Sequence, residues 1–208
     1  MATVSTLAQN LKEYVDESIT GSYPTNDELI RWFNDAEQII AEETDCLKKY
    51  TASAVDVSAS TVIDVPSDWL RGKQVMWGKT RHLDYVEIDD LLESSYDITT
   101  TGTPTYWYIW DEHIQFYPVP SADATCYIYY IKSPVAMTTT ASSPSIPAHY
   151  QKLLVLYAAY RFWLKEEEAT MAQMFYGEFM QGLAKMKSTT MKKSARKQYR
   201  THDSAGYL

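Results

Sequence analysis

The chain has 208 residues, of which 45% are hydrophobic and 13% aromatic, enough apolar material for one real core or two small ones. Its two cysteines, Cys46 and Cys126, form no CxxC motif, which favours thiols from a reducing compartment over a disulfide. The first residues lack the regions of a signal peptide, and no apolar run approaches the roughly 18 residues of a membrane span, so we expect neither.

The net charge of −8 conceals an uneven distribution along the chain. Residues 1–184 carry 12 basic and 26 acidic side chains, whereas residues 185–208, the basic segment, carry seven basic and one acidic. The net charges are therefore −14 and +6. An acidic body joined to a basic arm indicates that the arm binds a partner of its own.

Helices are predicted for the N-terminal part, residues 1–49. Residues 3–19 have a weak amphipathic pattern, and residues 25–47 repeat apolar side chains with the 3.6-residue period of a helix. Thr25 and Glu28 have the spacing of a capping box, which predicts where the second helix begins.

A β-rich insert is predicted over residues 50–136. Its strands are short, and turn residues such as Gly78-Lys79 and Asp111-Glu112 separate them. A short helix is predicted at residues 87–95. The clearest strands are residues 106–110, 113–117 and 125–132.

The C-terminal part returns to helical spacing. A low-complexity linker, residues 137–146, precedes helical residues 147–187, which we interpret as two helices folded back near Glu166–Glu168. Residues 188–208 lose the apolar period, so we expect a disordered basic tail.

The predicted fold class is therefore α+β in one compact domain plus tail. N- and C-terminal helices would pack as a helical bundle, with a small antiparallel β lobe inserted between them and a disordered basic tail at the C-terminus.

Catalytic motifs do not emerge from the sequence. The four histidines are scattered without metal-ligand spacing, and no P-loop, GxSxG or GxGxxG pattern occurs. The carboxylates of Asp89-Asp90 and Glu166–Glu168 are better explained by a helix start and a solvated face. We expect a protein that is not an enzyme and has no metal or cofactor.

The aromatic strands of residues 106–134 raise three alternatives: a core, a platform for stacking bases, or a protein interface. Tyr127 and Tyr129 alternate with Ile128 and Tyr130, which predicts rings on both faces of a strand. A nucleic-acid-binding module with a basic tail is one alternative, but Lys132 is the only basic residue in this stretch, and phosphate neutralisation supplies most non-specific affinity.

A protein interface fits these strands better. One face would be covered by the chain's own helices and the other by a neighbour, although a small barrel filled by its own aromatics remains an alternative. The candidate interface residues are Tyr108, Trp110, Tyr117, Tyr127 and Tyr129.

Four stretches occur in an order that resembles the head-to-tail connector, or adaptor, proteins of tailed bacteriophages. They begin TNDELIRWFNDAEQ, VIDVPSDWLRGKQV, TGTPTYWYIWDEH and IPAHYQKLLVLYAA, and together they cover most of residues 20–187. Each stretch is a loose match, and their joint order is the specific part of the resemblance.

The resemblance implies a structural virion protein at the head-tail junction, made in the bacterial host cytoplasm. Members of this family form a ring, typically a homododecamer, under the portal. The ring extends the channel through which DNA passes during genome ejection, without sequence-specific binding, and it carries the tail proteins. No membrane partner is implied.

The resemblance also implies a role for the basic segment, because C-terminal segments in this family commonly grip the portal. The candidate portal-binding residues are Lys185, Lys187, Lys192, Lys193, Arg196, Lys197, Tyr199 and Arg200.

Overall fold

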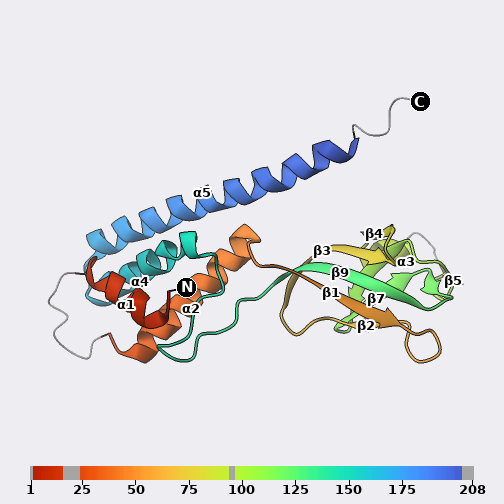
Figure 1. The fold of residues 1–208 in the computed structure, drawn as a ribbon, viewed down its shortest axis with the longest axis horizontal. Helices are drawn as coiled ribbons and strands as arrows, with labels where there is room; N and C mark the ends of the chain where they lie inside the picture. The colour runs from red at the N-terminus through yellow and green to blue at the C-terminus, as the bar shows by residue number, and fades with distance from the viewer. Residues whose placement is uncertain (1, 16–23, 94–96, 203–208) are drawn as a thin grey trace. The chain divides into compact units, whose positions relative to one another are not determined.

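The computed structural model describes residues 2–15, 24–93 and 97–202, with side chains described as far as residue 190 (Figure 1). The chain divides into two compact units. The helical unit contains Met1–Leu47 and Ser133–Leu208, and the β unit contains Lys48–Lys132. Within the described residues, no helix combines the length and apolar character needed to cross a membrane.

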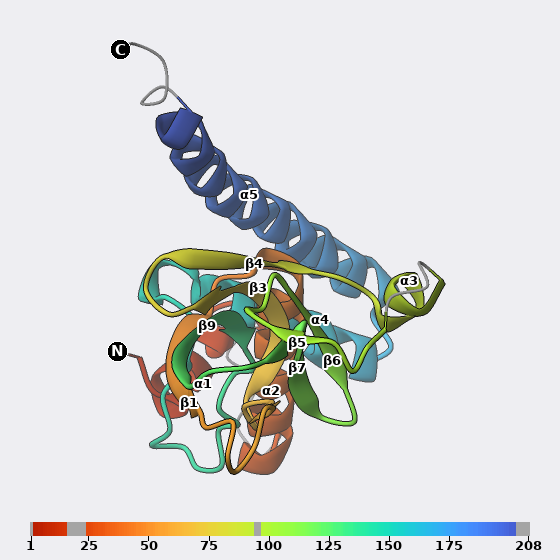
Figure 2. The same ribbon diagram turned by 90° about the vertical axis from the view of Figure 1, so that its right-hand side faces the viewer.

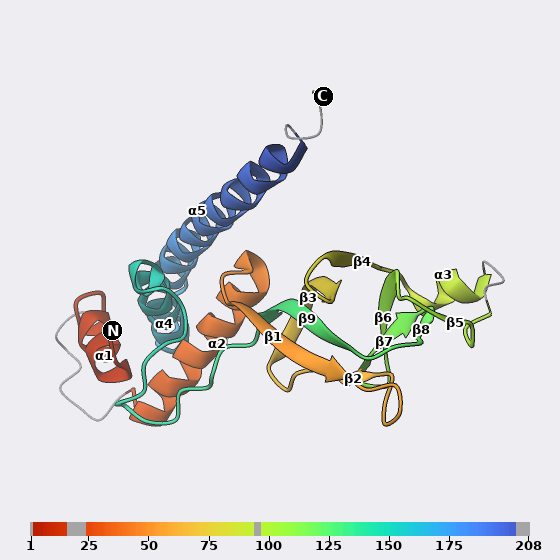
Figure 3. The same cartoon turned by 45° about the vertical axis from the view of Figure 1, so that its right-hand side comes forward.

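In its described residues, the helical unit contains four α-helices, which Figure 3 labels, and one 3₁₀ turn. Thr25 caps α2 as predicted: its side chain accepts a hydrogen bond from the Glu28 backbone, and the Glu28 carboxylate accepts one from the Thr25 backbone. The elements are α1 (Val4–Lys12), α2 (Asn26–Thr44), η1 (Ala148–Tyr150), α4 (Lys152–Lys165) and α5 (Ala169–His202).

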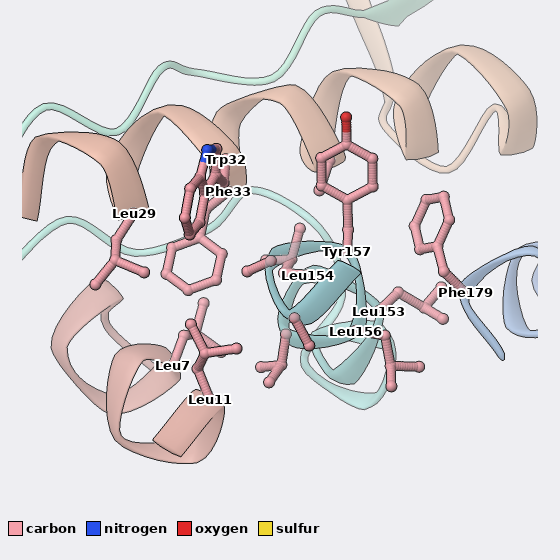
Figure 4. Packing of buried hydrophobic residues seen from close by; sticks show 14 of the residues in the cluster. Leu7, Leu11, Leu29, Trp32, Phe33, Leu153, Leu154, Leu156, Tyr157 and Phe179 are labelled. Carbon is pink, nitrogen blue, oxygen red and sulfur yellow. The ribbon is translucent and has the colours of Figure 1, made fainter. Parts of the chain in front are cut away.

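Every α-helix of this unit contributes to one apolar core (Figure 4). Leu11 of α1, Phe33 of α2, Leu154 of α4 and Phe179 of α5 are all buried there. The helical period found in the sequence is therefore the buried stripe of each helix. The predicted reversal between the last two helices is confirmed, with Glu167 in the left-handed region at φ 62°.

Two polar side chains of α2 hold the segment that returns from the β unit. Asn34 donates to the Met137 carbonyl at 2.9 Å and accepts from the Met137 N–H at 2.8 Å. The fully buried Glu37 carboxylate accepts from the backbone N–H groups of Ser145 and Ile146. A segment of low sequence complexity is thereby ordered, because its backbone polar groups find partners on the helix.

The β unit consists of a seven-stranded sheet, a two-stranded sheet and the short helix α3 (Ile88–Glu93). The large sheet has the order β1-β9-β3-β4-β6-β7-β2. Its strands are β1 (Lys48–Val55), β2 (Ile63–Asp64), β3 (Trp69–Trp77), β4 (Arg81–Tyr85), β6 (Tyr106–Trp110), β7 (His113–Tyr117) and β9 (Ala124–Lys132). The small sheet pairs β5 (Thr101–Gly102) with β8 (Val119–Pro120).

The sheet curls round on itself (Figure 2), and its inward side chains form a core of their own. Its two edge strands, β1 and β2, are consecutive in the chain. The core of the β unit contains Trp107, Phe116, Ile128 and Tyr130, and every member of it comes from this unit. The expectation that helices cover one face of the sheet is wrong, since the sheet covers that face itself.

The predicted fold class needs correction in three respects. The chain is a mixed α+β protein with a large, nearly closed sheet, and not a helical bundle with a small β lobe. The sheet is not purely antiparallel, because β4 pairs with β6 in parallel. Residues 188–202 belong to α5, so disorder there is wrong as well; residues 203–208 lie outside the described residues.

We expect Asn34→Ala to lower the free energy of unfolding by about 2 kcal/mol, because it leaves two backbone groups of Met137 without their partner. Urea denaturation measures the change. Gln38→Ala is the control: Gln38 lies on the same helix and bonds only to the exposed Glu42, so less than about 0.5 kcal/mol is expected. Equal losses in the two variants would contradict a specific role for Asn34.

Candidate assembly surfaces

Two neighbouring strands, β1 and β9, bring tyrosines together on the outer face of the sheet. Tyr50 of β1 lies opposite Tyr129 of β9, and their rings stack with centroids 5.7 Å apart. Tyr50 is 62% exposed and Tyr129 is 40% exposed. Tyr127 lies two residues along β9, between Ala52 and Met76. We call Tyr50, Ala52, Met76, Tyr127 and Tyr129 the tyrosine face. It is an uncharged surface on which Tyr50, Ala52 and Tyr129 are exposed, and Met76 and Tyr127 are half-buried.

The other face of β9 is dry. Cys126 and Ile128 are buried there, so the predicted alternation along this strand is confirmed. Burial raises the pKa of the Cys126 thiol to about 12, which keeps it protonated and unreactive at neutral pH. Alternate residues of β9 therefore face the core and the outer surface of the sheet.

A second exposed aromatic residue lies at the end of a hairpin. The predicted turn at Asp111-Glu112 joins β6 to β7, and both residues have positive φ, 52° and 60°. Trp110 precedes the turn and is 56% exposed. His113 follows it and contacts the Asp64 carboxylate at 3.2 Å through Nε2. An exposed tryptophan on a conformationally restricted turn is a common form of protein contact site.

The structure separates the remaining predicted interface residues from these surfaces. Tyr108 and Tyr117 are 7% and 8% exposed, in a cluster with Leu91 of α3. The Tyr108 hydroxyl donates to Gln115 Oε1 at 3.1 Å. These two rings therefore support α3 from within the β unit, whereas Trp110 and Tyr129 are exposed and Tyr127 is half-buried.

Basic residues lie beside the tyrosine face, and sequence reasoning missed them. Lys48 and Arg71 both lie opposite Ile131 of β9, one on each side, and Lys73 occupies a bulge of β3 next to Gln74. All three are exposed. They are distant in sequence from residues 106–134, and only the strand order brings them alongside. The sequence predicts little positive charge near these strands because it shows only the basic residues within residues 106–134, and these three lie outside that stretch.

The predicted portal-binding residues all fall on α5. Lys185 is exposed, and Lys187 donates to the Glu43 carboxylate of α2 at 2.8 Å. The remaining candidates follow residue 190, where only the helix backbone is described: Lys192, Lys193, Arg196, Lys197, Tyr199 and Arg200. Residues 185–202 of the basic segment therefore belong to the helix α5.

One polar cluster stabilises the β unit. Asp68 accepts hydrogen bonds from Tyr130 at 2.7 Å and from Lys49 at 2.8 Å. Burial alone would raise the pKa of Asp68, but the hydrogen bonds from Lys49 and Tyr130 outweigh it and lower the pKa below its ordinary value. The cluster connects β1 to β9 through the loop before β3.

We expect Asp68→Asn to lower the free energy of unfolding by about 1 kcal/mol at pH 7. The pKa of Asp68 is depressed in the folded state, so the carboxylate stabilises the fold above its unfolded pKa, about 4, and this contribution is lost as the pH falls through the folded pKa. Urea titrations at neutral pH and near pH 3 should therefore show the two proteins converging in acid. A constant difference at both pH values would contradict the ionic origin.

Among the described residues, no group of three or more His, Cys, Asp and Glu side chains is arranged to hold a metal ion. The features that the structure does assemble are exposed surfaces. A family model described as SU10 adaptor protein matches residues 2–203, nearly the whole chain. No curated protein matches the chain.

Proposed function

Because the chain belongs to the SU10 adaptor protein family and is thus a structural component of a phage virion, we propose that it joins head to tail. In this proposal the chain forms a ring under the portal, extends the DNA channel and presents a surface to tail proteins. The observation that carries it is the family match across residues 2–203, which covers both units.

The basic segment supports portal binding. It has a net charge of +6 on a chain whose remaining residues have −14, and its residues 185–202 belong to the helix α5. A cationic helix on an acidic protein is suited to a separate, anionic site on a partner. The helical form lowers the entropy lost on binding, compared with a disordered tail that orders only in the complex.

The tyrosine face and Trp110 support contacts with neighbouring subunits or with tail proteins. Both are uncharged and present exposed aromatic rings, those of Tyr50, Tyr129 and Trp110, which is a composition typical of interface centres. The acidic body supports a channel role, since negative charge repels DNA phosphates and lets the genome slide without sticking.

We expect a chain ending at Met186 to remain folded and to lose binding to portal rings encoded by the same genome. Met186 is the last buried residue among the described side chains of α5, so the truncation leaves the core intact. Native mass spectrometry of chain and portal rings measures the gain, about one copy per portal subunit for the full chain.

A second variant separates charge from helix length in that experiment. It replaces Lys192, Lys193, Arg196, Lys197 and Arg200 by Gln, which removes the charge and keeps a good helix former. Loss of binding in both variants supports an electrostatic grip. Full binding by the truncated chain would place the portal contact elsewhere.

We expect Tyr129→Ser and Trp110→Ser to weaken tail attachment at least tenfold while the melting temperature changes little, because both rings are exposed. Attachment to portal–chain complexes is measured with purified tail proteins. Leu92→Ser is the control, since Leu92 is 53% exposed on α3, an element that contains neither ring. A lowered melting temperature with unchanged attachment would show that the rings serve stability.

A nucleic-acid-binding surface is the second candidate function. The observation that favours it is the position of Lys48, Arg71 and Lys73 beside the stacked rings of Tyr50 and Tyr129. The same Tyr129→Ser variant discriminates the two functions. Salt-dependent binding of single-stranded DNA that this variant loses would favour the second function, and its absence would favour the first.

A further inference from the structure

The outward side of α5 is a wide uncharged surface. Between Ala169 and Ser188 the only charged residues of this helix are Glu178, Lys185 and Lys187. The side opposite the core presents Met174, 46% exposed, and Met180, 43% exposed, together with polar and small residues. We define the α5 outer face as Thr170, Gln173, Met174, Gly177, Met180, Gln181, Ala184 and Ser188.

The residues of the α5 outer face recur every seven positions, as in helices that pack on another helix. Thr170, Gly177 and Ala184 form the first row, Met174, Gln181 and Ser188 form the second, and Gln173 and Met180 have the same spacing. The first row is small enough to let a second helix approach closely. One side of α5 therefore packs in the core of its own unit, and the opposite side has the residue spacing of a surface that packs against a second helix.

The two glycines of α5 differ in what surrounds them. A Cβ added at Gly182 would lie 2.3 Å from Leu153 Cδ2, so that glycine allows α5 to pack closely on α4. A Cβ added at Gly177 would meet nothing within 4 Å. A glycine within a helix costs about 1 kcal/mol relative to alanine, and for Gly177 no close neighbour among the described residues offsets this cost. A close contact with another molecule would do so.

The charges that border the α5 outer face identify the partner helix. Glu178 and Lys185 lie seven residues apart, about two turns, and so on the same flank. Both side chains are exposed. When a second copy of α5 lies antiparallel, Glu178 of each copy faces Lys185 of the other. The surface is thus complementary in charge to itself.

We propose that the chain, before it meets any partner, pairs with a second copy through the α5 outer face, with the two helices antiparallel. Gln181 of one copy then lies against Ala184 of the second copy, and Ser188 against Gly177 of the second copy. Two Glu178–Lys185 ion pairs flank these contacts. The arrangement follows from the seven-residue rows and from the positions of the two charges.

This pairing goes beyond the proposed function and does not depend on it, because it concerns the chain alone. A two-fold contact of this kind uses the same patch on both copies and is closed. It cannot continue into a ring through the same face. Formation of a ring through that face would therefore require the pair to separate first, which would keep the chain from assembling before its partner is present.

Charge-reversal variants of the full-length chain test the pairing by sedimentation equilibrium. Glu178→Lys places two lysines opposite each other at both flanks, and Lys185→Glu places two glutamates there, so each single variant should dimerise about tenfold more weakly or worse. An equimolar mixture of the two variants restores both ion pairs, and we expect it to dimerise as the wild-type chain does. Glu13→Lys changes the net charge equally off α5 and is the matched control.

Each outcome decides the proposal. Weak pairing of each variant alone, with recovery on mixing, establishes the antiparallel contact. A wild-type chain that stays monomeric at about 100 µM overturns it, as does an oligomer whose mass is the same in all variants. Weak pairing without recovery on mixing also overturns it, because the two charges would then not face each other. Circular dichroism of each variant checks that the helices are retained.

Discussion

The architecture depends on the two hydrogen-bonding side chains of α2 that receive the chain when it returns from the β unit. The helical unit is assembled from residues far apart in sequence, with the whole β unit inserted between them. Asn34 and Glu37 pair with backbone groups of Met137, Ser145 and Ile146, and Met137 and Ile146 then bury their own side chains. Without these partners the backbone groups would be buried at a cost, and α4 would have no fixed starting point.

Because the sheet curls on itself, its tyrosines fall into two groups, one buried inside the sheet and one on its outer surface. A sheet that curls on itself has a dry inside and a wet outside, so neighbours along one strand have different environments. Tyr130 is inside, where Asp68 satisfies its hydroxyl and Trp69 stacks on its ring at 5.2 Å. Tyr129, the preceding residue, is outside against Tyr50. The high tyrosine content thus serves both a core and a surface, since the residue has an apolar body and a polar tip.

Local features of the sequence predicted local structure well, and non-local pairing escaped them. The capping box of α2 and the Asp111-Glu112 turn were predicted because a few adjacent residues determine each. The parallel pairing of β4 with β6 and the closure of the sheet depend on residues dozens of positions apart, which no local pattern reports. For the same reason, the sequence does not predict that Lys48 and Arg71 lie beside β9.

The helical state of residues 188–202 shows where periodicity misleads. That stretch lacks an apolar stripe, which predicts disorder, yet it is rich in Lys and Arg, residues that favour helices. A helix already formed through Met186 also lengthens without a new nucleation step. Lack of an apolar stripe indicates lack of a core contact, and not lack of structure. α5 therefore has three distinct surfaces. Its first half has a core-facing stripe on one side and an uncharged outer face on the other, and its C-terminal end is cationic. Assembly can therefore use the last two without disturbing the first.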